Sequence, residues 1–313
     1  MPCSLTGGGR FSILPLGVPA PLPIDSATVI VLREVNDACQ VLLVERHAES
    51  RAFAGAHVFP GGRVDAADAA ALLHGVSPRL APRAAAARLG EGIAPAAALA
   101  FWVAAIRELF EEAGLLLARV DGLPVSFSDA PTRGRFAAQR AAILAGETSF
   151  ADVVAAERLE LATDSLHYFS RWITPVNAPR RYDARFFVAH VPAGQAPLHD
   201  DRETISTVWL TPRAALAEAR IGKMILAPPT VRTLDDLAVL GTLPCILAAA
   251  DARTVTPILP KPVQIDGCTA VLYPGDAEYD AAMPGASLLD DGAGRRNRAI
   301  MRDGGWRSIR TPE

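Results

Sequence analysis

Three glutamates with helical spacing stand out as side chains that could do chemistry. Glu108, Glu111 and Glu112 occupy positions i, i+3 and i+4 of a segment that reads Arg-Glu-Leu-Phe-Glu-Glu-Ala-Gly-Leu. On an α-helix this spacing places all three carboxylates on one face. Like charges at such distances repel, and a cation between them would reverse the sign of that interaction. Hard divalent ions such as Mg²⁺ take carboxylate oxygens as ligands and often bind beside substrate phosphates.

The same segment also has a purely structural interpretation. Apolar residues recur with helical spacing from Trp102 to Phe110, which predicts a helix packed on a core, and Gly114 is placed to end it. The acidic face would then be solvated, with a surface ion pair between Arg107 and Glu111. The segment alone does not distinguish the two interpretations, so the decision depends on the elements around it.

A glycine-rich segment precedes the acidic helix and could bring backbone oxygens close to it. Val58 and Phe59 are expected to form a short strand, and Pro60, Gly61 and Gly62 predict a tight turn. Because glycine lets a backbone approach closely, carbonyl groups near the two glycines could complete the ligand shell of a metal ion.

The rest of the chain predicts a mixed sheet with helices packed on it. Apolar, β-branched residues at 27–33 and 40–46 indicate a hairpin whose turn lies at Asn36 and Asp37. We expect helices at 96–113, 135–145, 149–161, 212–220 (capped by Thr211) and 230–240, and further strands at 115–120, 169–173, 184–191 and 204–210. Strands and helices do not alternate strictly, which favours an α/β protein of the α+β type, a mixed β-sheet sandwiched between helices.

Composition divides the chain into four parts. Residues 1–24, rich in glycine and proline, predict a flexible N-terminal arm, and residues 25–245 the main domain. Within that domain the alanine-rich residues 66–95 predict a helical insertion. Residues 246–313 change character, with short strands between Gly, Pro and Asp, and form a C-terminal extension of unassigned role.

Bulk properties limit the partners and the compartment. A net charge of −3 over 313 residues gives no reason to expect a nucleic-acid or membrane-surface partner. The four cysteines are scattered without a CxxC pair, which argues against a zinc ribbon or disulfide framework and fits a reducing compartment, so we expect a cytoplasmic protein. Four prolines interrupt the apolar residues 11–24, so we expect neither a signal peptide nor a membrane span.

The glycine segment and the acidic helix together resemble the signature of the Nudix hydrolases, G-x5-E-x7-R-E-U-x-E-E-x-G-U, where U is apolar. The second half matches at every position from Arg107 to Leu115. Arg107 follows Gly62 by 45 positions, where the signature has 14, so about 31 residues are inserted. The acid of the first half falls at Asp68, an aspartate in place of the glutamate, and Asp65 is an alternative.

The interruption itself resembles one branch of that superfamily, the acyl-coenzyme A diphosphatases with a split Nudix box. Residues 42–46 and the Phe-Pro-Gly-Gly segment resemble a stretch shared by coenzyme A-directed Nudix enzymes, and the resemblance covers roughly residues 25–240. It implies a Nudix fold and hydrolysis of the diphosphate bond of coenzyme A or acyl-coenzyme A. The products would be adenosine 3′,5′-bisphosphate and (acyl-)4′-phosphopantetheine. ADP-ribose, NADH or another nucleotide as substrate, or a non-catalytic ligand sensor, are the alternatives.

The resemblance implies roles for individual acidic residues. Mg²⁺ or Mn²⁺ is expected on Glu108, Glu111 and Glu112. Nudix enzymes often add an acid from a loop outside the box, and Glu203 is our candidate for a further ligand or general base. We therefore expect the catalytic group to comprise Glu108, Glu111 and Glu203 with Arg107, which would orient the carboxylates rather than touch the substrate.

Substrate binding calls for cations, because coenzyme A carries a 3′-phosphate. Arginine binds phosphate through paired hydrogen bonds, and we select Arg46, Arg63 and Arg181 together with the backbone at Gly61 and Gly62. Arg46 is the best candidate because it ends the strand that leads into the glycine segment. The expected partner is a small molecule, and a homodimer is compatible with the sequence.

Overall fold

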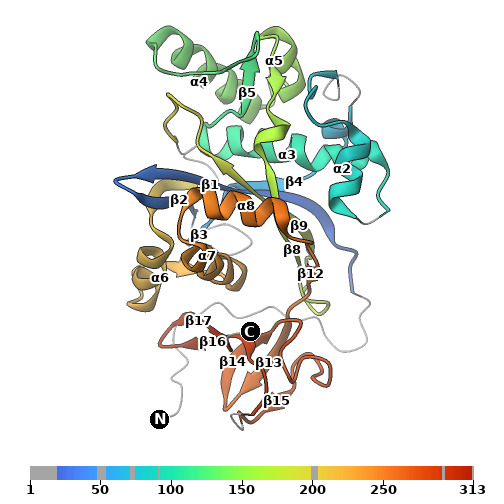
Figure 1. The fold of residues 1–313 in the computed structure, drawn as a ribbon, viewed down its shortest axis with the longest axis vertical. Coiled ribbons are helices and arrows are strands. Elements are labelled where there is room, and N and C mark those ends of the chain that lie inside the picture. Colours follow the sequence, from blue (N-terminus) through green and yellow to red (C-terminus); the bar gives the residue numbers. More distant parts are fainter. Residues whose placement is uncertain are drawn as a thin grey trace.

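A central sheet with helices on both faces forms the body of the protein, and a smaller sheet lies at its C-terminal end (Figure 1). The structure is a computed structural model and describes residues 20–47, 54–70, 75–90, 92–198, 204–290 and 293–311.

Strand β1 (Ile24–Val35) is the centre of the large sheet. It forms a hairpin with β2 (Ala38–Arg46). At the turn Asn36 and Asp37 have φ angles of 49° and 61°, a conformation that these two residue types tolerate well. The predicted hairpin is confirmed, and both strands are longer than the apolar runs that indicated them.

Alternate residues of β1 enter two different cores. Val29 and Val31 pack in the core under α3 (Pro95–Ala113), whereas Ile30 and Leu32 pack in the core on the opposite face of the sheet. Successive side chains of a strand point to opposite faces, so a strand buried on both sides needs apolar residues at every position. The run Val-Ile-Val-Leu meets this requirement.

The large sheet is mixed and forked. Its strand order is β11-β3-β2-β1-β9-β8-β12, with β4 also pairing to β1 and β10 to β2. The pairs β1–β9, β3–β11 and β8–β12 are parallel, and the others are antiparallel. The remaining strands are β3 (Ala56–Val58), β4 (Gly61–Arg63), β8 (His167–Ile173), β9 (Tyr182–His190), β10 (Thr204–Leu210), β11 (Ile225–Leu226) and β12 (Pro257–Ile258).

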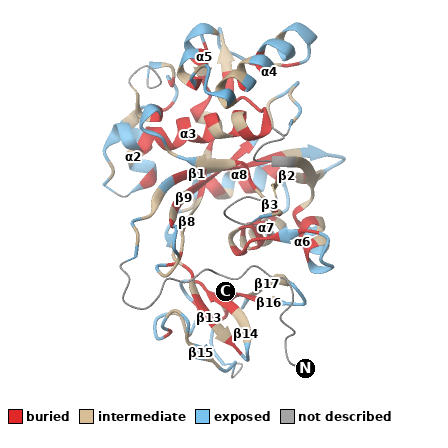
Figure 2. Ribbon diagram, turned by 180° about the vertical axis from the view of Figure 1, so that it is seen from behind, coloured by how far each residue is buried: buried red, intermediate tan, exposed pale blue. Residues whose placement is uncertain are grey.

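Helices cover both faces of this sheet, as the predicted fold class requires (Figures 1 and 2). One side carries α3, whose buried residues form a continuous band in Figure 2. The same side carries α2 (Pro82–Leu89), α4 (Ala130–Ala145), α5 (Phe150–Ala156), the 3₁₀ turns η1 (Ala66–Ala69) and η2 (Thr163–Ser165), and the strands β5 (Ala118–Val120), β6 (Leu123–Pro124) and β7 (Glu160–Leu161). The other side carries α6 (Pro212–Arg220), α7 (Pro228–Leu240) and α8 (Leu243–Ala252).

Some predicted helix limits differ from the observed ones. The helix predicted at 135–145 begins at Ala130, because the Asp129 carboxylate accepts a hydrogen bond from the Thr132 amide at 2.8 Å. The helix predicted at 149–161 ends at Ala156, and its last two residues form β7 instead. The predicted cap of α6 is confirmed, since the Thr211 hydroxyl accepts from the Ala214 amide.

The C-terminal extension contains its own five-stranded sheet, in the order β15-β13-β14-β16-β17. Helix α8 runs across the boundary that we predicted after residue 245, because Ile246 and Ala250 are buried in the core of the central sheet. The separate sheet therefore begins only at Lys261. Its strands are β13 (Lys261–Ile265), β14 (Cys268–Leu272), β15 (Ser287–Leu288), β16 (Asn297–Arg302) and β17 (Gly305–Arg310).

None of the helices that the structure describes is by itself long and apolar enough to cross a bilayer. Helices α7 and α8, bent by 112° at their junction, have the required length and composition only when taken together.

Candidate active site

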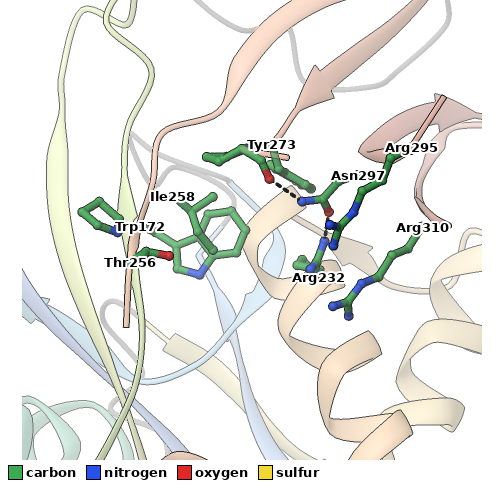
Figure 3. Close-up of a pocket in the computed structure, with 10 residues that line it drawn as sticks. Trp172, Arg232, Thr256, Ile258, Tyr273, Arg295, Asn297 and Arg310 are labelled. Atoms are coloured by element: carbon green, nitrogen blue, oxygen red, sulfur yellow. Dashed lines mark hydrogen bonds between the residues drawn. The ribbon is translucent and has the colours of Figure 1, made fainter. Parts of the chain in front are cut away.

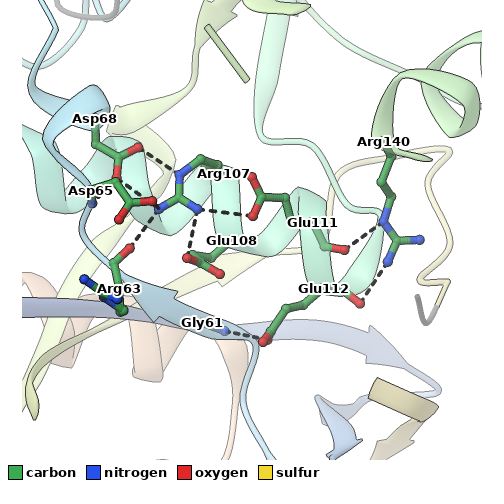
Figure 4. Close-up of polar contacts among 9 residues, drawn as sticks. All are labelled: Gly61, Arg63, Asp65, Asp68, Arg107, Glu108, Glu111, Glu112 and Arg140. Atoms are coloured by element: carbon green, nitrogen blue, oxygen red, sulfur yellow. Dashed lines mark hydrogen bonds and ion pairs between the residues drawn. The ribbon is translucent and has the colours of Figure 1, made fainter. Parts of the chain in front are cut away.

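The guanidinium of Arg107 is the hub of the acidic face of α3 (Figure 4). Its Nε and Nη2 donate to the two oxygens of Asp68 at 2.9 and 3.0 Å, and Nη2 also donates to the Arg63 carbonyl at 2.8 Å. Its Nη1 donates to Glu108 at 2.8 Å and to Glu111 at 3.2 Å. Arg107 thus contacts one carboxylate of the first half of the motif and two of the second, and its predicted role in orienting the carboxylates stays a prediction.

Asp68, rather than its rival Asp65, is the acid that completes the first half of the motif. Asp68 is 1% exposed and forms a bidentate pair with Arg107, 39 positions away in sequence. The Asp65 side chain is 58% exposed and its nearest oxygen lies 3.7 Å from Arg107 Nη2. Helix α2 lies within the insertion and packs on α3, so the two halves of the motif meet despite the insertion.

The two glycines form a strand next to β1, not the tight turn that we predicted. Gly62 pairs with Ala27, and a Cβ at Gly61 would lie 2.4 Å from the Ala27 carbonyl oxygen, so only glycine permits this close pairing. A Cβ at Gly62 would lie 2.5 Å from the carboxylate of Glu108. The Gly61 amide donates to Glu112 at 2.9 Å. The glycines thus leave room for one carboxylate and hold another.

Substitution of Gly62 by alanine should therefore disable the site more than the fold. The added methyl group would displace Glu108, and we expect Gly62→Ala to lower kcat by about 10²-fold, the scale associated with misplacing a catalytic group by about 1 Å. Gly134→Ala is the matched control, because a Cβ at Gly134 in α4 meets nothing within 4 Å. Steady-state kinetics compares kcat of the two variants, and circular dichroism checks that both fold. Equal kcat values would contradict the claim that Gly62 leaves room for Glu108.

Burial disfavours the ionised form of the glutamates on this face. Desolvation raises the pKa of Glu108 to about 7, although the charge and hydrogen bond of Arg107 act in the opposite direction. The pKa of Glu111 is also raised, again mainly by burial. Glu112 is only 4% exposed. One guanidinium thus contacts three carboxylates of low exposure, an arrangement that favours a second cation.

The donor set suits a hard divalent ion, although the side chains do not yet converge. No three His, Cys, Asp or Glu side chains gather around one point within the described ranges, because Glu108 and Glu111 turn toward Arg107 while Glu112 turns toward Gly61. The donors are carboxylate oxygens beside glycine backbone, which is the ligand chemistry of Mg²⁺ and Mn²⁺. A bound ion would compete with Arg107 for Glu108 and Glu111.

The raised pKa of Glu108 predicts a pH-dependent response to metal. In the metal-free protein this pKa lies above its unfolded value, so the contribution of Glu108 to stability is fully present below about pH 4.5 and lost as the pH rises through about 7. Mg²⁺ requires the ionised group, so the rise in Tm on adding Mg²⁺ should be larger at about pH 8 than at about pH 6. Differential scanning calorimetry tests this, and an equal or larger rise at the lower pH would contradict it.

The other predicted residues are only partly brought to the site. Glu203 lies outside the described residues, so its role stays a prediction. Arg46 ends β2, and its Nε is buried without a hydrogen-bond partner in the described part of the chain. The Arg63 side chain is exposed, and only its carbonyl takes part in the hub around Arg107.

Arg181 has a structural position that the sequence did not indicate. Its side chain is buried, and it donates to the backbone carbonyls of Thr174 at 3.0 Å and Pro21 at 3.1 Å. One donor therefore holds the chain before β1 and another the chain after β8, which leaves fewer for the substrate phosphate that we assigned to it.

Sequence analysis missed Arg140 of α4. Its Nε and Nη2 donate to the carbonyls of Glu111 and Glu112 at 2.9 and 3.1 Å, so it caps the C-terminal end of the acidic helix (Figure 4). Gly114 ends that helix in the left-handed conformation, with φ of 66°. Contacts over nearly 30 positions leave no local spacing pattern, so no sequence signal pointed to Arg140.

A cavity of about 360 Å³ opens beside this face. Asp68, Arg107 and Glu111 form its polar wall. Its opposite wall is apolar and comes from the ends of α4 and α5, with Leu144 and Phe150 among its residues. The cavity therefore joins a charged end to a hydrophobic end.

Comparison with known families identifies this arrangement. The sequence profile described as the NUDT19 Nudix domain matches residues 24–237, which include both halves of the motif and every strand of the central sheet except β12. The chain belongs to the NUDT19-type Nudix hydrolases. It is thus a member of a diphosphatase family that typically uses a divalent metal and acts on small nucleotide derivatives.

Individual relatives agree with this assignment. The acyl-coenzyme A diphosphatase NUDT19 of Homo sapiens is 30% identical over 240 residues, covering 65% of this chain and 62% of that protein. The Gallus gallus protein of the same name is 31% identical over 223 residues, covering 61% and 58%. This chain therefore spans about three fifths of those two relatives. Putative nudix hydrolase 7 of Caenorhabditis elegans is 27% identical over 242 residues, covering 77% and 70%.

The solved structure of a Nudix hydrolase from Alicyclobacillus acidocaldarius supports the fold. It superposes with a TM-score of 0.57 at 23% identity and covers 72% of this chain and 96% of that one. The predicted Nudix fold is confirmed.

Proposed function

We propose that this protein hydrolyses the diphosphate bond of acyl-coenzyme A, and of coenzyme A itself. The observation that carries the proposal is the contact between Asp68 and Arg107, which rejoins the two halves of the Nudix motif across the insertion. An insertion that had destroyed the site would leave Arg107 without its acid. The two acyl-coenzyme A diphosphatases at 30% and 31% identity support the choice of substrate.

The residues of the site divide the work of this reaction. Glu108 and Glu112, with Glu111 as a further or shared ligand, would hold Mg²⁺ or Mn²⁺. The bound ion would neutralise the diphosphate and lower the pKa of the attacking water. Arg107 keeps Glu108 and Glu111 aimed at one side of the helix. Water adds to one phosphorus of the diphosphate while the bond between that phosphorus and the bridging oxygen breaks. The two products are phosphate monoesters, adenosine 3′,5′-bisphosphate and (acyl-)4′-phosphopantetheine.

The cavity beside the acidic face supports an acyl-bearing substrate. Its apolar wall suits the acyl-pantetheine arm, while its charged end adjoins the diphosphate site. ADP-ribose, the main alternative, has a polar ribose in place of the acyl-pantetheine arm and gains little from such a wall.

Changing the apolar wall should therefore separate two substrates. We expect Leu144→Gln to lower kcat/KM for a long-chain acyl-coenzyme A by about tenfold, the scale of a few misplaced methylene contacts, and to leave free coenzyme A nearly unchanged. Leu123→Gln, at a position 72% exposed on β6, is the matched control. The measurement is kcat/KM for both substrates in parallel. An equal loss of kcat/KM for both would contradict binding of the acyl arm in this cavity.

A substrate panel tests the proposal as a whole. Purified protein with Mg²⁺ or Mn²⁺ is incubated separately with acyl-coenzyme A, coenzyme A, NADH and ADP-ribose, and the products are identified by mass spectrometry. We expect adenosine 3′,5′-bisphosphate from the first two. Cleavage of ADP-ribose with coenzyme A left intact would contradict the proposed substrate and favour ADP-ribose. Tight binding without turnover of any compound would favour a ligand sensor.

A further inference from the structure

The last turn of α3 carries two of the three glutamates of the acidic face, and it also ends the helix. Glu111 and Glu112 lie two positions and one position before Ala113, its last residue. The last four carbonyl groups of an α-helix have no partner within the helix. Here two of the four belong to these glutamates, so the groups that meet the carbonyls decide how firmly the glutamates are held.

All four of these carbonyls accept a hydrogen bond, from three different parts of the chain. The first and the last accept from the backbone amides of Gly114 and Leu198, at 3.0 and 2.9 Å. Arg140 of α4 meets the two in between: its Nε donates to the Glu111 carbonyl at 2.9 Å, and its Nη2 to that of Glu112 at 3.1 Å. One guanidinium from another helix thus satisfies the carbonyls of both glutamates.

Packing holds Arg140 over this helix end (Figure 4). Arg140 is 8% exposed, which is rare for an arginine without such partners. Phe136, one turn earlier on the same face of α4, meets Phe110 of α3 edge to face, with ring centroids 6.4 Å apart. A Cβ at Gly114 would lie 3.5 Å from Arg140 Nη1, so the guanidinium rests against the turn that ends α3. The aromatic contact sets α4 against α3, and Arg140 reaches across to the carbonyls.

The contacts of Arg140 with α3 go through the backbone. Arg140 is not among the described residues that line the cavity beside the acidic face, where α4 contributes from Ile143 onward. The carboxylates of Glu111 and Glu112 contact other groups, on Arg107 and Gly61. A substitution at Arg140 would therefore move the last turn of α3 without removing a carboxylate or a wall of the cavity.

We propose that Arg140 is a positioning residue for the metal site: by holding the last turn of α3, it sets the affinity of Glu111 and Glu112 for a divalent ion. Groups that orient metal ligands from outside the ligand set typically contribute about 10- to 100-fold to metal affinity or activity. The positive charge of Arg140 also lies at the negative end of the helix dipole, where it stabilises the last turn. The inference rests on the metal site of the proposed function and does not depend on which substrate is cleaved.

Mn²⁺ binding, measured by electron paramagnetic resonance on the full chain without substrate, tests this role. Free Mn²⁺ gives a signal that is lost on binding, and the binding that disappears in Glu112→Gln defines the site. We expect Arg140→Gln to raise the Kd for Mn²⁺ at this site by at least about tenfold. Arg140→Lys keeps the positive charge and a donor, so its Kd should lie between those of the wild type and Arg140→Gln.

Arg232 of α7 provides the matched control. Its side chain is 11% exposed, and it lines a cavity of about 220 Å³ where α7 meets the C-terminal sheet (Figure 3). Helix α7 packs in the core on the face of the sheet opposite α3. Arg232→Gln thus removes a buried guanidinium far from the acidic face, and it should keep the wild-type Kd for Mn²⁺. Circular dichroism and thermal unfolding compare the folds and stabilities of all variants.

The outcomes separate this inference from the proposed function. Wild-type affinity in both Arg140 variants would overturn the positioning role and leave the proposed substrate unaffected. An equal loss of affinity in Arg232→Gln would also overturn it, because the loss would then follow from general destabilisation. If Arg140→Gln does not fold, a wild-type Kd in Arg140→Lys overturns the role. A wild-type protein that binds no Mn²⁺ would refute the metal site on which both proposals rest.

Discussion

Glu112→Gln is expected to lower kcat for acyl-coenzyme A by about 10³-fold, the scale seen when one electrostatic element of a transition state is removed. Glu112 is 4% exposed and accepts from the Gly61 amide at 2.9 Å. Glutamine has nearly the same shape and keeps an oxygen for that hydrogen bond, so the connection between α3 and β4 survives. What is lost is the negative charge that would hold a divalent ion.

Kinetics and stability must therefore be measured together for this variant. We expect kcat to fall severely while the free energy of unfolding changes by less than about 1 kcal/mol, as for a near-isosteric change that keeps its hydrogen bond. Glu147→Gln, at an exposed position after α4, is the matched control and should keep wild-type kcat. Near wild-type turnover by Glu112→Gln would mean that the metal site is misplaced.

Asp68→Asn is expected to have the largest effect on stability. Asp68 is 1% exposed and contributes both oxygens to Arg107, whose side chain is 11% exposed. Removal of one partner of a buried ion pair leaves an uncompensated charge, at a cost of about 3 kcal/mol. Glu108 and Glu111 also contact Arg107, so we place the expected loss at the lower end of the usual range. Loss of this anchor also releases the guanidinium from the position that orients those glutamates.

Urea denaturation of Asp68→Asn and Asp65→Asn measures the difference between the two rival acids. Asp65 is largely exposed and 3.7 Å from Arg107, so its variant should lose less than about 1 kcal/mol, as exposed ion pairs do. Asp68→Glu keeps the negative charge and restores the glutamate of the Nudix signature, but it lengthens the side chain. Comparison with Asp68→Asn therefore separates the effect of the lost charge from the effect of a changed side-chain length. Equal losses for the two asparagine variants would show that Asp68 does not anchor the motif.

Local patterns were sufficient to predict β1, its hairpin turn and α3. The β-branched run of β1, the turn residues Asn36 and Asp37, and the apolar stripe of α3 each follow from the preferences of neighbouring residues. The acidic face of α3 followed from helical spacing alone. These features needed no knowledge of contacts between distant parts of the chain.

Contacts between distant segments could not be predicted in the same way. The spacing from Gly62 pointed to Asp68 with Asp65 as its alternative, but the contact of Asp68 with Arg107 depends on how the insertion folds back. Arg140 reaches α3 from another helix, and Arg181, which lies just before β9, donates to carbonyls before β1 and after β8. The glycines 61 and 62 suggested a turn because glycine is common there, whereas close packing against β1 and Glu108 is the reason for them here.

Phosphorus NMR of acyl-coenzyme A tests most directly whether the rejoined motif is a diphosphatase. The substrate is incubated with the wild-type protein and Mg²⁺, and with Glu112→Gln as the matched sample. The proposed reaction predicts that the two diphosphate signals disappear and phosphate monoester signals replace them, in the wild-type sample only. Diphosphate signals that persist in the wild-type sample, or that disappear equally in both, would contradict it.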